Sequence, residues 1–250
     1  MPPPLEEVIE PVSEPPLKSE VSRILDVFVA PQEAFADIVR KPRWWIPVIL
    51  ISIVATIFTV AYSRRVGFEQ MIRQVLQGSQ QAQSMPPAQM EAAIQRGAGI
   101  AQFFAYGGAV ISIGLSVFVI AVVLMFLFDT IMGADIGLVR MLGIVAYGFL
   151  PTLVSYALAL LVLYLKAPED FNIQNPLAFN AAILVSSDAP LWMKSLAGSF
   201  DLFSFWIMTL MAVGVSAASR KIGFGKAFAT ILFPWAMYVA LKTGALVLRG

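Results

Sequence analysis

The 250-residue chain contains neither cysteine nor histidine. Haem ligated by histidine or cysteine, a thiolate nucleophile, a histidine-ligated zinc site and a Ser–His catalytic couple are therefore all excluded. Charge is also scarce, since Lys, Arg, Asp and Glu make up 13% of the residues against about 25% in soluble domains. The net charge is only +1, so no nucleic-acid partner is expected. No catalytic, metal-binding or cofactor-binding constellation remains, and an enzyme is not expected.

Apolar residues, at 58%, dominate what is present. A hydrocarbon core of roughly 30 Å needs about 20 apolar residues in helical form. The stretches that meet this length are residues 44–62, 104–128, 141–165, 197–218 and 228–248. The sequence therefore predicts an all-α integral membrane protein, a bundle of five transmembrane helices in a lipid bilayer.

The N-terminus has a different composition. Residues 1–20 hold six prolines and five glutamates, which disfavours helix and predicts a disordered tail. Residues 21–250 are then the membrane domain.

Two short amphipathic helices are expected before the first span. Apolar residues recur at helical spacing before and after Pro31, and basic residues follow; they are Val21, Ile24, Leu25, Phe28, Phe35, Ile38, Val39, Arg40, Lys41 and Arg43. Such helices would lie in the membrane interface, with the basic cluster on anionic lipid. Alternatively, the apolar stripes pack on the bundle itself, and the two placements are compatible.

The connections between spans differ in length. Residues 63–103 suggest a helical extension of span 1 and a second helix that starts after Pro87. Residues 166–196 hold a short apolar piece, Ala181–Val185, suited to an interfacial or re-entrant segment, and a helix that Asp188 could cap. No internal repeat is visible, which weakens the usual signature of a secondary transporter.

Lysine and arginine indicate the orientation. With the N-terminus inside, nine of these residues face the cytoplasm and seven face outward. We therefore expect a cytoplasmic N-terminus and an external C-terminus, in a bacterial inner membrane.

Charges in or near the spans are the candidate functional residues. Asp201 and Lys242 are expected at similar depth, where they either form a salt bridge or Lys242 extends to the interface. Asp129 ends span 2 close in depth to Arg140 and is expected to be a boundary or pairing residue. Because Asp129 and Asp201 belong to opposite sides of the bilayer, they cannot form an aspartyl-protease dyad.

Small residues and prolines give weaker signals. Pro151 and Pro234 should kink spans 3 and 5. Small residues at four-residue spacing predict close helix packing within the bundle or, alternatively, in a homo-oligomer; they are Gly108, Ser112, Ser116, Gly214, Ala218, Ala236, Ala240 and Gly244.

Several short motifs together resemble the bacterial-like branch of the Yip-domain family of five-span proteins. The family patterns "P-x-E-A-F … P-x-W-W-x-P" before span 1, "R … YsxLP" at span 3 and "D-x-F-x-x-W" at span 4 match, in order, Pro31, Phe35, Pro42, Trp44, Trp45, Pro47, Arg140, Tyr147, Pro151, Asp201 and Trp206. The resemblance covers about residues 21–248 and implies a five-helix membrane fold of no established chemistry. Eukaryotic members bind Rab/Ypt GTPases, but this chain lacks their "DLDGP"-type block, which argues against a Rab-type partner.

Two functions are compatible with these observations. The first is a non-enzymatic scaffold or interaction protein, whose N-terminal helices touch the membrane surface or a membrane-protein partner. The second is a small transporter or channel with a polar path near Asp201 and Lys242.

Overall fold

The computed structural model describes residues 16–77, 84–173, 175–186 and 188–248; most of the predicted disordered tail lies outside them. The described part of the chain is helical and contains no β-strand apart from an isolated bridge between Asn180 and Asp201. Its elements are α1 (Glu20–Val29), α2 (Pro31–Ile38), α3 (Trp45–Arg65), α4 (Phe68–Gln77), α6 (Pro87–Met125), η1 (Phe126–Ile131), α7 (Leu138–Gly148), α8 (Pro151–Leu165), η2 (Pro168–Asp170), η3 (Ala181–Leu184), α9 (Leu191–Ser199), α10 (Leu202–Ala218) and α11 (Phe224–Val247).

Five apolar helical segments form the bundle. Four are long enough to cross a membrane by length and composition: Trp45–Arg65, Ile111–Ile131, Leu138–Leu165 and Phe224–Val247. The remaining one, α10, has 17 residues, or about 26 Å at 1.5 Å per residue, which is at the lower end of the spanning range. The predicted fold class is confirmed.

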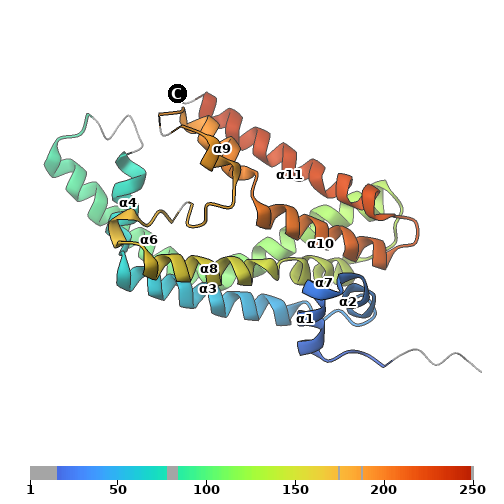
Figure 1. Ribbon diagram of the computed structural model, residues 1–250. Coiled ribbons are helices and arrows are strands. Elements are labelled where there is room, and N and C mark those ends of the chain that lie inside the picture. Colours follow the sequence, from blue (N-terminus) through green and yellow to red (C-terminus); the bar gives the residue numbers. More distant parts are fainter. Residues whose placement is uncertain (1–15, 78–83, 174, 187, 249–250) are drawn as a thin grey trace, which may run out of the picture.

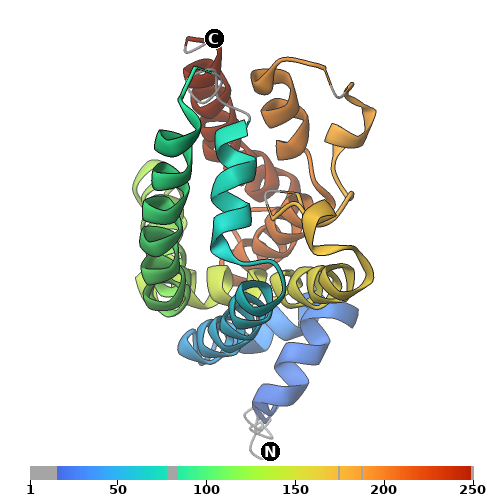
Figure 2. The same ribbon diagram turned by 90° about the vertical axis from the view of Figure 1, so that its left-hand side faces the viewer.

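The two ends of the bundle carry different elements. Helices α1 and α2 lie at the same end as the α10–α11 loop, at the right of Figure 1, whereas α4 and the end of α11 lie at the other. We call these ends the N-terminal face and the opposite face. In Figure 2, which looks along α3 and α8 from the opposite face, α1 is seen from the side and projects from the bundle.

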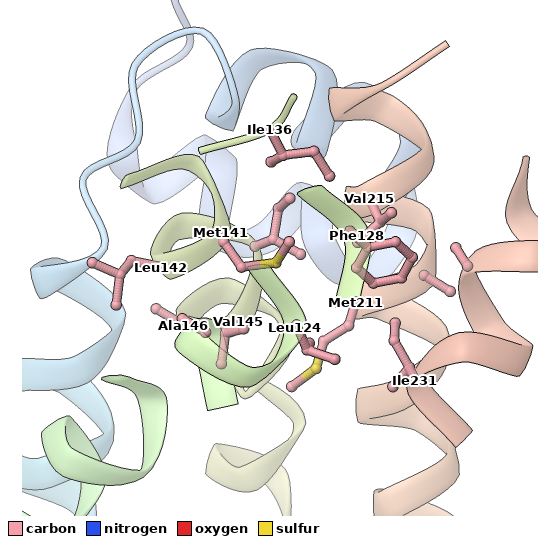
Figure 3. Close-up of a cluster of buried hydrophobic side chains, with 14 of the residues drawn as sticks. Leu124, Phe128, Ile136, Met141, Leu142, Val145, Ala146, Met211, Val215 and Ile231 are labelled. Atoms are coloured by element: carbon pink, nitrogen blue, oxygen red, sulfur yellow. The ribbon is translucent and has the colours of Figure 1, made fainter. Parts of the chain in front are cut away.

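The largest core cluster lies toward the N-terminal face. Side chains from α6, η1, α7, α10 and α11 point toward one another there, as Figure 3 shows for Leu124, Phe128, Met141, Val145, Met211, Val215 and Ile231. All of these are buried. This cluster holds together α7 and α10, the spans against which α1 and α2 pack.

The first connection departs from the prediction. Instead of extending span 1, the helix ends at Arg65, the chain turns at Gly67 (φ +86°), and α4 folds back on α6. Glycine adopts this left-handed backbone without strain. A second glycine, Gly97 on α6, leaves room for Ile72 of α4, which would lie 3.0 Å from an added Cβ. The helix predicted after Pro87 is α6, whose 39 residues extend about 58 Å, so that it projects beyond a bilayer.

Other helix boundaries also differ from the prediction. Span 3 is broken between α7 and α8, with Pro151 as the first residue of α8, whereas α11 continues through Pro234. The helix in the third connection is α9, but Pro190 occupies its N-cap position rather than Asp188. Span 4 starts at Leu202, later than expected, because the preceding residues as far as Ser199 belong to α9.

Candidate interaction site at the N-terminal face

An arginine buried between α1 and α2 is the centre of the site. The Arg23 side chain is 1% exposed and donates from Nε to Oδ2 of Asp37, at 2.6 Å. Its Nη1 donates to the carboxylate of Glu20 at 2.9 Å and to the carbonyl of Lys41 at 3.1 Å. A charge removed from water needs such partners, because an unpaired buried ion is strongly destabilising.

Glu20 connects this pair to the membrane bundle. It also accepts from Arg43, at 3.0 Å, and from the hydroxyl of Tyr147 on α7. Tyr147 is fully buried. One carboxylate thus joins the start of α1, the segment before α3 and the third span.

A second, more exposed ion pair lies at the start of α1. The ammonium of Lys18 donates to Asp26 at 2.7 Å and to Glu33 at 3.2 Å. The bond from Lys18, with a second from the Ser22 hydroxyl, lowers the pKa of Asp26 below its usual value of 3.8. The same bond to Asp26 raises the pKa of Lys18.

Beneath these charges, an apolar cluster attaches α1 and α2 to α7 and α10. Phe35 and Ile38 of α2, Val27 of α1 and Leu210 of α10 are buried in it. Close approach at this contact requires Gly214, since an added Cβ would lie 2.9 Å from Cδ1 of Phe35. The predicted stripes therefore pack, in part, on the bundle.

Val21 and Leu25 of the predicted apolar stripe instead face outward, together with Leu17 and Val29. Four residues of α1 and the segment before it, spaced by four, are 42, 68, 60 and 80% exposed: Leu17, Val21, Leu25 and Val29. Ile24 and Phe28 lie between this outward flank and the buried flank. We call the four residues the outward flank of α1.

The predicted basic cluster is largely paired within the protein. Residues 16–44 contain five bases and four acids: Lys18, Arg23, Arg40, Lys41 and Arg43 against Glu20, Asp26, Glu33 and Asp37. Arg43 binds Glu20, and Arg40 lies 3.8 Å from Asp37. The charge available to attract anionic lipid is therefore smaller than the sequence suggested.

Residues of the resemblance gather at this same place. Pro31 begins α2, Phe35 and Tyr147 are buried in the apolar cluster, and Trp206 packs edge-to-face on Phe28 with ring centroids 5.7 Å apart. Pro42 lies against Gly143 of α7, where an added Cβ would be 2.8 Å from the Cβ of Pro42.

The other motif residues position span 1 and α8. Trp44 caps α3 and packs on the core, Trp45 is half exposed, Pro47 is buried, and Pro151 begins α8.

Two predicted charges lie elsewhere on the N-terminal face. The carboxylate of Asp129, at the end of η1, accepts from the backbone amides of Ile136 and Gly137, both at 2.8 Å. It therefore holds the loop that leads into α7. Arg140 is exposed on the first turn of α7.

Asp201 and Lys242 engage different partners. Asp201 caps α10 by accepting from the Ser204 amide at 2.9 Å, and Lys242 donates to the hydroxyl of Ser199 at 3.3 Å. The two residues lie near the same turn, but no ion pair of the described residues joins them. A hollow of about 270 Å³ between α3, α6 and α8 is lined by uncharged residues, among them Thr59 and Tyr156.

Sequence reasoning missed two arginine roles. Arg23 is one of the nine basic residues that indicate the orientation, but a charge inside an apolar stripe also indicates a buried pair. Arg65 donates to the carbonyls of Leu163, Tyr164 and Lys166 and so caps the end of α8. Its partners lie about 100 residues away, so no local pattern predicts the contact.

The comparisons with known proteins identify the family of the chain. Residues 25–243 match the Yip1 domain. The chain belongs to the Yip1 domain family. A curated relative, "Membrane protein YknW" of Bacillus subtilis strain 168, is 26% identical over 230 residues, which cover 90% of this chain and 91% of the relative. No solved structure matches this Yip1-domain protein.

Proposed function

We propose that this Yip1-domain membrane protein is a non-enzymatic interaction protein, whose N-terminal face binds a partner protein. The observation that carries the proposal is the buried Arg23–Asp37 pair, which with Glu20 fixes α1 and α2 in one position on the bundle. Buried ion pairs are weak evidence for stability but can specify one arrangement. A surface held in one arrangement loses less entropy when it binds.

The partner surface that we propose is the outer side of α2. Gln32, Glu33 and Ala36 are exposed there, while Phe35 and Asp37 of the same helix are buried. The exposed side is therefore presented by a helix that cannot turn without breaking the buried contacts.

Transport is the weaker alternative. It would need a polar path, but Asp201 and Lys242 have local partners and the hollow between α3, α6 and α8 is uncharged. No specific observation favours a transported ion or solute.

The proposal includes an orientation. The excess of lysine and arginine on the N-terminal face supports a cytoplasmic N-terminus and an external C-terminus, and the bacterial relative supports a bacterial inner membrane. Because the chain has no cysteine, single cysteines introduced at Ser22 and Gln95 report which side of the membrane each position faces in intact cells. An impermeant reagent should label only Gln95→Cys, and labelling of Ser22→Cys instead would reverse the orientation.

Photo-crosslinking in the native membrane tests the partner. A photoreactive residue at Gln32 or Ala36 should capture the same protein, and one at the exposed Gln95 on α6 should not. Ala36→Trp should abolish capture from Gln32 without changing the amount of protein, with Gln95→Trp as the matched control. Capture that is equal at all three positions, or unaffected by Ala36→Trp, would contradict the proposal.

A further inference from the structure

The outward flank of α1 is an apolar surface that the bundle leaves uncovered. At about 100° per residue, three sectors follow one another around this helix. The first sector faces the bundle and contains Arg23 and Val27. The second is the outward flank, with Val21, Leu25 and Val29, and the third is polar, with Ser22 and Asp26. A helix that meets protein, lipid and water on three sides needs this distribution.

The position of α1 places it at the membrane boundary. Glu20, its first residue, binds Arg43, which directly precedes Trp44 and Trp45 at the start of span 1. Tryptophan is enriched at membrane–water interfaces. The apolar surface of α3 begins at this level, with Trp45, Ile49, Ile53 and Ile57 each about half exposed.

The direction of α1 agrees with this placement. In Figure 2 α3 and α8 are seen nearly end-on and α11 is inclined to them, whereas α1 is seen from the side and extends past the edge of the bundle. It therefore runs close to the membrane plane, beyond the area that the spans occupy.

We infer that the outward flank of α1 is inserted into the interface of the protein's own bilayer. The occupant of this surface is lipid, and the contact is apolar rather than electrostatic. Residues 16–44 carry five bases against four acids, and Lys18, Arg23 and Arg43 already have acidic partners within the protein, so anionic headgroups add little beyond a contact with the exposed Lys41. Insertion should therefore be the same in neutral and anionic membranes and should not change with salt, which screens exposed charges.

Spin labels on the full-length protein in nanodiscs test this inference. Single cysteines replace Val21, Leu25 or Ser22, in a chain that has no other cysteine. Labels at Val21→Cys and Leu25→Cys should be more accessible to oxygen, which concentrates in lipid, than to an aqueous nickel chelate. The label at Ser22→Cys, about 100° from Val21 and about 60° from Leu25 around the same helix, should show the reverse.

Two further experiments change the lipid composition and the outward flank itself. The pattern should be the same in phosphatidylcholine alone, in phosphatidylcholine with phosphatidylglycerol, and at high salt. A label at Val29→Cys should lose its oxygen preference when Val21→Ser and Leu25→Ser are combined, since both side chains are exposed and their replacement spares the core. Aqueous accessibility at Leu25 equal to that at Ser22 would overturn the inference, and insertion only in anionic lipid would overturn its apolar basis. The assay contains no partner protein, so its failure and the failure of the proposed partner surface on α2 are separate results.

Discussion

The buried Arg23–Asp37 pair gives the most demanding prediction. Arg23→Met removes the bonds to Asp37, Glu20 and the Lys41 carbonyl and leaves the Asp37 carboxylate, 8% exposed, without its closest cation. Breaking a buried pair from one side costs about 3–5 kcal/mol. Glu20 keeps Arg43 and Tyr147, so the effect should concentrate on Asp37 and on the attachment of α1 and α2.

Hydrogen exchange of the protein in nanodiscs measures this attachment. A loss of about 3–5 kcal/mol is roughly two to three and a half orders of magnitude in the opening equilibrium, and exchange of the amides of α1 and α2 should accelerate accordingly. The amides in the middle of α8 should not change. Arg40→Met is the matched control, because Arg40 lies 3.8 Å from Asp37 and is one-third exposed, and should cost less than about 1 kcal/mol.

A double replacement separates the loss of a partner from the loss of the pair. Arg23→Met with Asp37→Leu removes both charges, and such apolar replacements are often neutral or stabilising. Protection in the double variant should therefore return to within about 1 kcal/mol of the natural protein. Unchanged exchange in Arg23→Met, or a double variant as unstable as the sum of the single ones, would refute this account of the site.

Three further perturbations test other contacts. Gly214→Ala places a Cβ 2.7 Å from Ile144 and should lower the unfolding free energy by about 1–3 kcal/mol in a thermal-stability assay, whereas Gly244→Ala, where no atom lies within 4 Å, should be neutral or stabilising. Arg65→Leu removes three carbonyl contacts and should cost about 1–2 kcal/mol, because solvent reaches the group, with faster amide exchange confined to the end of α8. Since the pKa of Asp26 is lowered on folding, its contribution is complete above pH 3.8 and is lost as the pH falls through the lower folded value. A spin label on α1 should therefore gain mobility only in that acidic range, and no such transition should occur in Asp26→Asn.

Length and composition were sufficient to predict the five membrane segments. The absence of polar residues over about 20 positions admits few structures other than a spanning helix. The ends of helices were harder to predict from the sequence. The left-handed turn at Gly67, for example, depends on the packing of α4 against α6, a distant part of the chain. Asp188 is a good capping residue by type, but α9 starts three residues beyond it, at Leu191, with Pro190 at the N-cap position.

The site was predicted only in part, for a different physical reason. The periodicity of α1 identified an amphipathic helix but could not divide its apolar residues between the bundle and the outward flank, since that division depends on how α2 and α7 pack. The partner of Arg23 is 14 residues away on another helix, outside the three- and four-residue spacings at which helical side chains meet. The motif residues were recognised singly, and only the fold brings Phe35, Tyr147 and Trp206 together.

The buried charges also explain how one flank of α1 comes to be left outside. The apolar residues of this helix cover more than half of its circumference, so hydrophobic packing alone would accept several rotations of α1 on the bundle. The bond from Arg23 to Asp37 fixes one of these rotations, and the bond from Tyr147 to Glu20 fixes the position along α7. The double variant without the pair should therefore keep α1 attached yet allow it to turn, which would reduce the contrast between labels at Ser22 and Leu25. On this argument the ion pair contributes orientation rather than stability, and the orientation directs the outward flank toward lipid.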